Sequence, residues 1–287
     1  MANLKEIRNR ITSIKSTMQI TSAMKMVSAA KLKKAQDAIT AMRPYSSKLT
    51  ELLQNLSATL DSDAGGAYST QREIQKVLLV VVTSNRGLCG GFNSSITKEV
   101  LKTIEEKYSD TTVDLFAIGK KGEAILAKQL SVIENRNDIY DDLTFDNVAV
   151  IAEKLMDLYV DGSYDKIEIV YNQFKNAATQ IPQVEQFLPI KPIEGGEAIT
   201  NSDYIFEPSK EEIVLALIPK SLKTQLYKSI RDSFASEHGA RMTAMHKATD
   251  NATELRDELL LTYNKARQAA ITNEILEIVG GAEALNN

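Results

Sequence analysis

Residues 4–18 read LKEIRNRITSIKSTM, and the apolar side chains of this stretch recur at alternating intervals of three and four residues. Such intervals place them in one stripe along an α-helix, the pattern of a helix that pairs with a second helix. The first stripe consists of Leu4, Ile7, Ile11, Ile14 and Met18. A matching stripe near the other end consists of Leu255, Leu259, Thr262, Ala266 and Ala269, followed by Ile271, Ile275 and Ile278. The two ends are therefore predicted to pair.

Helix-breaking residues are rare in both arms. All 13 glycines lie at or after Gly65, Pro44 is the only proline before it, and no proline follows Pro219. Each arm runs for about 60 residues, and a helix of that length spans about 90 Å, more than a small domain can enclose. We therefore expect a long antiparallel two-helix coiled coil formed by residues 1–60 and residues 209–287.

The middle, residues 70–208, has the pattern of a small α/β domain. VLLVVVT at 77–83 is a short apolar run of the kind buried on both faces of a parallel sheet. The predicted strands are 77–83, 113–119 and 166–171, the predicted helices are 93–108, 120–130 and 148–159, and residues 180–190, which contain prolines, suit an edge or antiparallel strand. This alternation indicates a small Rossmann-like open sheet with helices on its faces.

The composition favours a folded, helix-rich chain and excludes several classes. Of 287 residues, 43% are apolar and 25% charged, and Cys89 is the only cysteine, so no internal disulfide can form. No apolar run approaches the roughly 20 residues of a membrane-spanning helix, and Met1–Arg10 is unlike a signal peptide, so we expect a soluble chain. The net charge of −4 is unevenly spread, because residues 1–43 carry a surplus of +7.

The glycine loop at 87–91, GLCGG, lies between a predicted strand and a predicted helix, where backbone N–H groups can hold a phosphate. It matches neither G-x-G-x-x-G nor the lysine-bearing P-loop, and the alternative is a tight turn with close backbone packing. Cys89 is either a nucleophile or a buried structural thiol. The spacing of His238 and His246 is not that of a metal site, and the acidic residues of 138–146 lack the spacing of a calcium loop. We expect no catalytic, cofactor-binding or metal-binding residues.

The basic first arm allows two interpretations. Its charges could neutralise nucleic-acid phosphates, or they could face a large acidic partner that lines a channel. The arm lacks interleaved aromatic residues, and composition alone does not choose between these partners.

Both ends of the chain resemble one protein family. Residues 5–11, KEIRNRI, and 20–32, ITSAMKMVSAAKL, look like the N-terminal helix of the gamma subunit of F-type ATP synthases. Four later stretches look like the C-terminal helix of the same subunit, namely SEHGARMTAM at 236–245, ATDNA at 248–252, YNKARQA at 263–269 and ITNEILEIVGGA at 271–282. The glycine loop with Phe92 and Asn93 resembles the loop after the family's first strand. Residues 61–75 and 131–147 match no part of the family's pattern.

The resemblance implies a central rotor shaft without an active site or cofactor of its own. In this family the paired helices enter a ring of alternating alpha and beta subunits, and the catalytic sites belong to beta. The globular domain and the lower coiled coil bind epsilon and rest on the membrane c-ring. The implied function is to couple rotation of a proton-driven c-ring to ATP synthesis or hydrolysis, with no nucleic-acid partner. The implied location is peripheral, at the cytoplasmic face of a bacterial plasma membrane.

The resemblance also assigns residues to these contacts. Arg267, Gln268 and Thr272 are expected as the catch that faces beta. The bearing region, turning in an apolar sleeve, is expected to include Met24, Met26, Val27, Ile275 and Ile278. For the first three, packing inside the coiled coil is the alternative. Tyr204 is expected at the foot, near epsilon and the c-ring. Gln19 replaces a usual lysine, and Gly239 replaces a usual alanine and is an expected weak point of the helix.

From the residues without the resemblance, two other classes stay open. An α/β nucleotide-dependent enzyme with helical extensions would bind ATP or NAD tightly on its own. A structural coiled-coil protein that uses its basic arm on nucleic acid would bind DNA with a steep dependence on salt.

Overall fold

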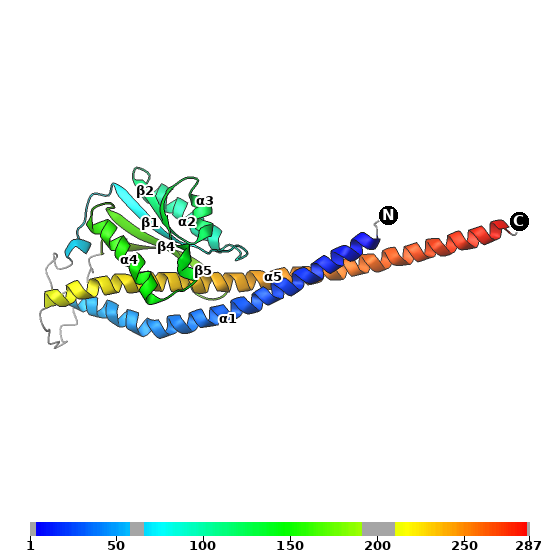
Figure 1. Cartoon of the computed structure of the whole chain (residues 1–287), viewed down its shortest axis with the longest axis horizontal. Helices are drawn as coiled ribbons and strands as arrows, with labels where there is room; N and C mark the ends of the chain where they lie inside the picture. Colours follow the sequence, from blue (N-terminus) through cyan, green and yellow to red (C-terminus); the bar gives the residue numbers. More distant parts are fainter. Residues whose placement is uncertain (1–3, 58–65, 191–209, 286–287) are drawn as a thin grey trace. The chain divides into compact units, whose positions relative to one another are not determined.

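The computed structural model describes residues 4–57, 66–190 and 210–285, and Figure 1 labels the α-helices and most of the strands. The α-helices are α1 (Leu4–Ser57), α2 (Phe92–Lys107), α3 (Lys120–Leu126), α4 (Phe145–Val160) and α5 (Lys210–Leu285). The strands are β1 (Lys76–Val82), β2 (Thr112–Ile118), β3 (Ser131–Asn135), β4 (Lys166–Phe174) and β5 (Gln180–Leu188). Two short 3-10 helices are η1 (Gly66–Tyr68) and η2 (Asn137–Tyr140).

The chain divides into two compact units, and both long helices contribute to each. The helical unit comprises Met1–Ser28 and Met242–Asn287, and the sheet unit comprises Ala29–Arg241. The division into domains at 1–60, 70–208 and 209–287 stays a prediction.

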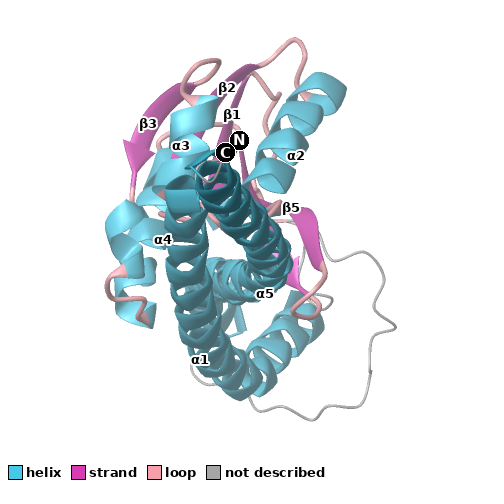
Figure 2. Cartoon of the chain, turned by 90° about the vertical axis from the view of Figure 1, so that its right-hand side faces the viewer, coloured by secondary structure: helices cyan, strands magenta, loops and turns pink. Residues whose placement is uncertain are grey.

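Within the described residues, the strands of the sheet unit form one sheet in the order β3-β2-β1-β4-β5. The neighbours β3, β2, β1 and β4 run parallel, and β5 pairs antiparallel with β4 at the edge. Figure 2 shows these strands with helices around them. The predicted Rossmann-like open sheet is confirmed, including the edge strand at 180–190.

The core of the sheet unit lies on both faces of β1. Every residue from Val77 to Val82 is buried, as its unbroken apolar run predicts. Leu78, Val80 and Val82 pack with α4 and with Leu226 and Ile230 of α5. On the other face, Val77, Leu79 and Val81 pack with α2 and with Leu126 of α3.

Strand β3 lies in the segment 131–147, in which no element was predicted. It is short and at the sheet edge, and Ile133 in its middle is 40% exposed. Because its side chains are exposed or half-buried, the strand has too little apolar alternation to be recognised from sequence.

In the helical unit, α1 and α5 run antiparallel (Figure 1). Arg8 Nη2 donates a hydrogen bond to the Tyr263 hydroxyl at 2.7 Å, and Thr249 Oγ1 donates to Thr21 Oγ1 at 2.8 Å. Partner numbers therefore fall along α5 as they rise along α1. The predicted antiparallel coiled coil is confirmed.

The buried stripe agrees with the prediction on α1 and only in part on α5. Ile7 and Ile11 of α1 are buried. On α5, Leu255 is 47% exposed, and Thr262 and Ala269 are exposed as well. The half-buried positions in this part of α5 are Ala252, Thr253, Arg256, Leu259, Leu260, Tyr263 and Ala266. The prediction was wrong at Leu255 because Arg256 and Tyr263 can bury apolar parts while keeping a polar tip in water.

None of the described helices has the length and apolarity needed to cross a membrane.

Candidate functional site

The C-terminal end of α5 is exposed on all sides. Every residue from Arg267 to Ala282 is exposed within the helical unit, and Ala266 is the last half-buried position before them. Five large apolar side chains in this end are between 45% and 69% exposed, namely Ile271, Ile275, Leu276, Ile278 and Val279. An isolated helix gains little stability in water, and an exposed apolar patch of this kind marks a surface for a partner.

The predicted catch residues lie on this exposed end but not on one face. Thr272 Oγ1 donates to the Gln268 carbonyl at 3.0 Å, so these two residues are neighbours about 40° apart around the helix. Arg267 lies about 100° from Gln268 and about 140° from Thr272. Gln268 and Thr272 can therefore meet one partner surface, whereas Arg267 points toward another.

The predicted bearing residues differ in exposure. Met26 and Val27 are 65% and 57% exposed, so the alternative of packing inside the coiled coil is wrong for these two. Met24 is half-buried. Ile275 and Ile278 are 54% and 69% exposed and lie less than one helical turn apart. Tyr204 lies outside the described residues.

In the sheet unit, the position at which open α/β sheets bind ligands is covered by another element of the same chain. That position lies outside the carboxyl ends of the strands, where the strand order reverses, which here is between β1 and β4. Helix α5 occupies it. Arg241 contacts the loop after β1, and a Cβ atom at Gly239 would lie 3.1 Å from Ala177 Cα in the turn after β4. Gly239, expected as a weak point, is thus where the helix backbone passes close to another segment.

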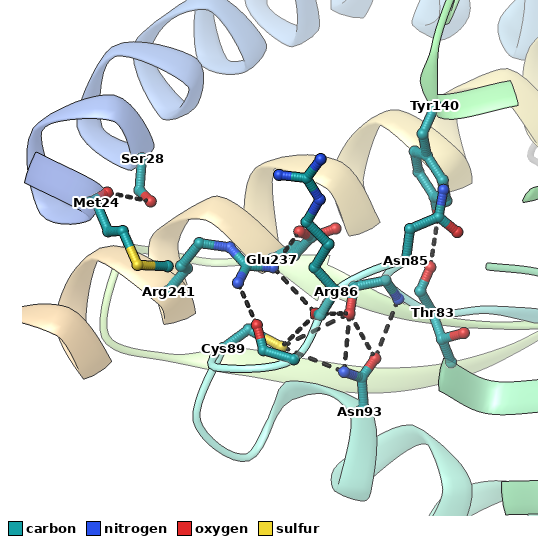
Figure 3. A network of polar contacts seen from close by, with 12 residues as sticks. Met24, Ser28, Thr83, Asn85, Arg86, Cys89, Asn93, Tyr140, Glu237 and Arg241 are labelled. Carbon is teal, nitrogen blue, oxygen red and sulfur yellow. Dashed lines mark hydrogen bonds and ion pairs between the residues drawn. The ribbon is translucent and has the colours of Figure 1, made fainter. Parts of the chain in front are cut away.

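Arg241 and Glu237 join α5 to the glycine loop (Figure 3). Arg241 Nη2 donates to Glu237 Oε1 at 2.6 Å and to the Arg86 carbonyl at 3.2 Å, and Nη1 donates to the Gly87 carbonyl. Both side chains are buried, at 8% and 10% exposure. Burial raises the pKa of Glu237, and the hydrogen bond and charge of Arg241 oppose that rise.

These contacts bear on the two interpretations of the glycine loop. A phosphate cradle presents backbone N–H groups to an anion. This loop instead presents two carbonyl oxygens to the guanidinium of Arg241. The contacts therefore support a tight turn that receives another part of the same chain.

Other side chains close the carboxyl ends of β1 and β2. The Tyr140 hydroxyl donates to the Thr83 carbonyl at 2.8 Å, and Asn85 Nδ2 donates to the Asn137 carbonyl at 2.8 Å. Gly119 has a φ of +108°, and a Cβ atom there would lie 2.1 Å from Thr83 O. Only glycine fits at this position, because both the backbone conformation and the space exclude a side chain.

Cys89 is a buried thiol rather than an exposed nucleophile. It is 2% exposed, and Asn93 Nδ2 lies 3.2 Å from its sulfur atom. Burial raises the pKa of the thiol, which disfavours the reactive thiolate.

The two histidines have unlike surroundings. His238 is 6% exposed, lies edge-on to the Phe234 ring at 4.5 Å, and finds no hydrogen-bond partner among the described residues. His246 is exposed and pairs with Asp250 at 3.3 Å. No group of three potential metal ligands gathers in the described part of the chain.

Sequence reasoning missed the Glu237–Arg241 pair. The signal was available, since the two residues are four apart in a predicted helix, a spacing at which opposite charges meet. What the spacing could not reveal is that the pair faces a loop more than 140 residues earlier in the chain.

The helical unit has an exposed apolar end, and in the sheet unit α5 covers the carboxyl ends of β1 and β4. These features are typical of a structural protein that binds partners. The profile of the ATP synthase family matches residues 3–285. The chain is 76% identical to the ATP synthase gamma chain of Flavobacterium psychrophilum, over 99% of both chains. It is 46% identical to the ATP synthase gamma chain of Geobacter sp. strain M21, again over 99% of both.

Solved structures have the same fold. The central stalk and c-ring structure of the Tetrahymena thermophila mitochondrial ATP synthase has a chain with 26% identity and a TM-score of 0.59, over 80% of this chain and 99% of that one. A chain of the Euglena gracilis mitochondrial ATP synthase has a TM-score of 0.69 at 21% identity, over 98% of this chain and 94% of that one. The chain belongs to the ATP synthase family and groups with its gamma chains. As a gamma chain, it is one subunit of the ATP synthase complex.

Proposed function

We propose that this chain transmits rotation of a proton-driven membrane c-ring to the catalytic beta subunits, and that the exposed end of α5 delivers the effect. The observation that carries the proposal is the exposure of every residue from Arg267 to Ala282, including five large apolar side chains. Such an end is stable only inside a partner. A sleeve formed by alternating alpha and beta subunits supplies one.

The coupling follows from linkage. A shaft with different side chains on its different faces offers each beta subunit a different surface, and a ligand shifts an equilibrium only through its unequal affinity for two states. Shifting a two-state equilibrium from 1:99 to 99:1 takes about 5.5 kcal/mol of differential contact. A few hydrogen-bonded contacts combined with steric exclusion can reach that value.

The catch residues divide this task. Gln268 and Thr272 share one face and can bond one beta subunit, and the Arg267 guanidinium, about 100° away, can fork onto a carboxylate of a neighbouring surface. The proposed bearing residues lie at two separate levels of the helix pair, with Met26 and Val27 on α1 and Ile275 and Ile278 near the end of α5. Their exposed apolar atoms allow turning without specific bonds.

The sheet unit is proposed to meet the membrane side of the complex. By family likeness, the sheet unit and Tyr204 would contact epsilon and the c-ring, and domain boundaries near 60 and 209 would separate them from the arms. The chain would then be peripheral at the cytoplasmic face of a bacterial plasma membrane.

Reconstitution tests this function. The isolated chain should hydrolyse no ATP, and adding it to alpha and beta subunits should yield an active complex. Gln268→Ala with Thr272→Val should lower the ATP turnover of that complex about tenfold, the effect of about 1.4 kcal/mol. Gln129→Ala, an exposed position in the sheet unit, is the matched control and should change nothing. Turnover by the isolated chain, or full turnover in the double variant, would contradict the proposal.

A further inference from the structure

Helix α5 is tied to the sheet unit by side chains that donate to main-chain carbonyls of separate segments. Gln225 Nε2 donates to the Gln186 carbonyl at 3.1 Å in β5, and Ser236 Oγ donates to the Asn172 carbonyl at 3.0 Å in β4. Two further donors, the guanidinium groups of Arg231 and Arg241, reach loops.

Arg231 Nη2 donates to the Leu143 carbonyl at 2.6 Å, in the loop before α4, and its guanidinium also bonds the Tyr227 hydroxyl. Arg241 bonds the Arg86 and Gly87 carbonyls in the loop after β1. Guanidinium groups have fixed donor directions, so each arginine prefers one orientation of the helix relative to its loop.

The four ties are distributed around the helix axis. Taking Gln225 as zero and about 100° per residue, Ser236 lies at about 20°, Arg241 at about 160° and Arg231 at about 240°. The ties therefore span more than half of the circumference of α5 and extend over 16 residues of its length.

The apolar contacts of α5 cannot fix its rotation in the same way. Ile218, Leu222, Leu226 and Ile230 form a stripe against the sheet, but apolar attraction is nondirectional. Hydrogen bonds weaken steeply when their angle changes, so ties at several positions around the axis oppose turning in either direction.

We infer that Gln225, Arg231, Ser236 and Arg241 form a torsional grip, in which the two arginines are the principal positioning residues that stop the sheet unit from turning about α5. This inference rests on the proposed function, because a grip matters only if torque passes between the sheet unit and α5. Without it, the rotor would twist at this joint before it turned its exposed end.

The test measures the angular fluctuation of a bead on this chain in its assembled complex with alpha and beta subunits. The alpha and beta subunits are fixed to a surface. A small bead is attached at Lys128→Cys, on the sheet unit, or at Lys247→Cys, on α5 beyond the grip; both positions are exposed. Cys89 is buried, so the introduced thiol is labelled selectively. Arg231→Lys with Arg241→Lys keeps both charges and removes the fork geometry.

We expect the angular variance of the bead at position 128 to increase about twofold in the double variant, because both guanidinium ties, which lie on the side of α5 away from Gln225 and Ser236, are weakened. The variance at position 247 should not change, and the ATP hydrolysis rate should stay at the wild-type value. Arg256→Lys is the matched control, since the Arg256 guanidinium bonds its neighbour Asp257.

Unchanged variance at position 128 in the double variant would overturn the inference, as would an equal increase at position 247. If the double variant does not assemble, Arg241→Lys and Ser236→Ala are measured singly, and unchanged variance in both overturns the inference. Failure of the proposed function looks different, because the wild-type beads would then show no ATP-driven rotation at either position.

Discussion

The buried imidazole of His238 predicts a specific sensitivity to acid. His238 is 6% exposed, and burial, with contributions from Lys31 and Arg241, lowers its pKa to about 4. Its ring contacts Phe234, and neither ring nitrogen finds a hydrogen-bond partner in the described chain. The folded sheet unit therefore resists protonation of this group.

The direction and size of the change in stability follow from the linkage between proton binding and folding. In the unfolded chain a histidine titrates near 6.5, so between pH 6.5 and pH 4 the unfolded state binds more protons than the folded state. Stability is thus fully present above pH 6.5 and decreases as the pH falls. Between pH 7 and pH 5 this difference in proton binding raises the unfolding equilibrium constant by a factor of about 20. The free energy of unfolding therefore decreases by about 2 kcal/mol.

Urea unfolding of the full chain at pH 7 and pH 5, followed by circular dichroism and tyrosine fluorescence, measures this loss. Other groups contribute to the total, so the prediction concerns a difference between variants. Wild type should lose about 2 kcal/mol more than His238→Gln over this pH interval. His246→Gln should lose as much as wild type, to within about 0.5 kcal/mol, because His246 is exposed and makes one exposed pair.

Equal losses in wild type and His238→Gln would show that the pKa of His238 is not lowered in the folded chain. That result would mean that the imidazole gains a proton in the folded state at a normal pKa, and hence that its surroundings admit water or a carboxylate.

Three further substitutions have expected outcomes. Gly119→Ala should lower the free energy of unfolding by about 3 kcal/mol or more, because the φ of Gly119 is +108° and the new Cβ atom would lie 2.1 Å from the Thr83 carbonyl oxygen. The control Gly91→Ala, at a φ of −80°, should be nearly neutral in the same urea titration. Thr21→Val should cost only about 0.5 kcal/mol in thermal unfolding, since it removes the contact between the Thr21 and Thr249 hydroxyls but leaves the Met245 carbonyl as an acceptor for Thr249. Ala266→Pro should cost α5 about 3 kcal/mol and abolish coupled ATP synthesis in reconstituted vesicles, and intact synthesis would contradict a continuous helix there.

The main features of the fold could be predicted because they depend on local patterns. The unbroken apolar run of β1 and the breaker-poor arms define a buried strand and two long helices without knowledge of their partners. Strand β3 could not be found this way, since its assignment depends on pairing with β2 rather than on its own composition. The buried stripe of α5 was predicted wrongly at Leu255 for a similar reason. Tyr263 is half-buried because it contacts Arg8, and this contact joins opposite ends of the chain.

For the candidate site, too, local patterns could be predicted, but contacts between distant segments could not. Motif resemblance supplied Arg267, Gln268 and Thr272, and the structure adds their angular arrangement, which separates Arg267 from the other two. Glu237 and Arg241 belong to a contact between α5 and a distant loop, so the sequence offers their spacing but not their target.

Direct observation of rotation tests whether this chain turns inside the alpha and beta subunits. A bead on position 247 of α5, in a complex whose alpha and beta subunits are fixed to a surface, should turn continuously in one direction when ATP is supplied and should stop when ATP is removed. ATP hydrolysis at the normal rate by the same complexes with the bead motionless would contradict the account.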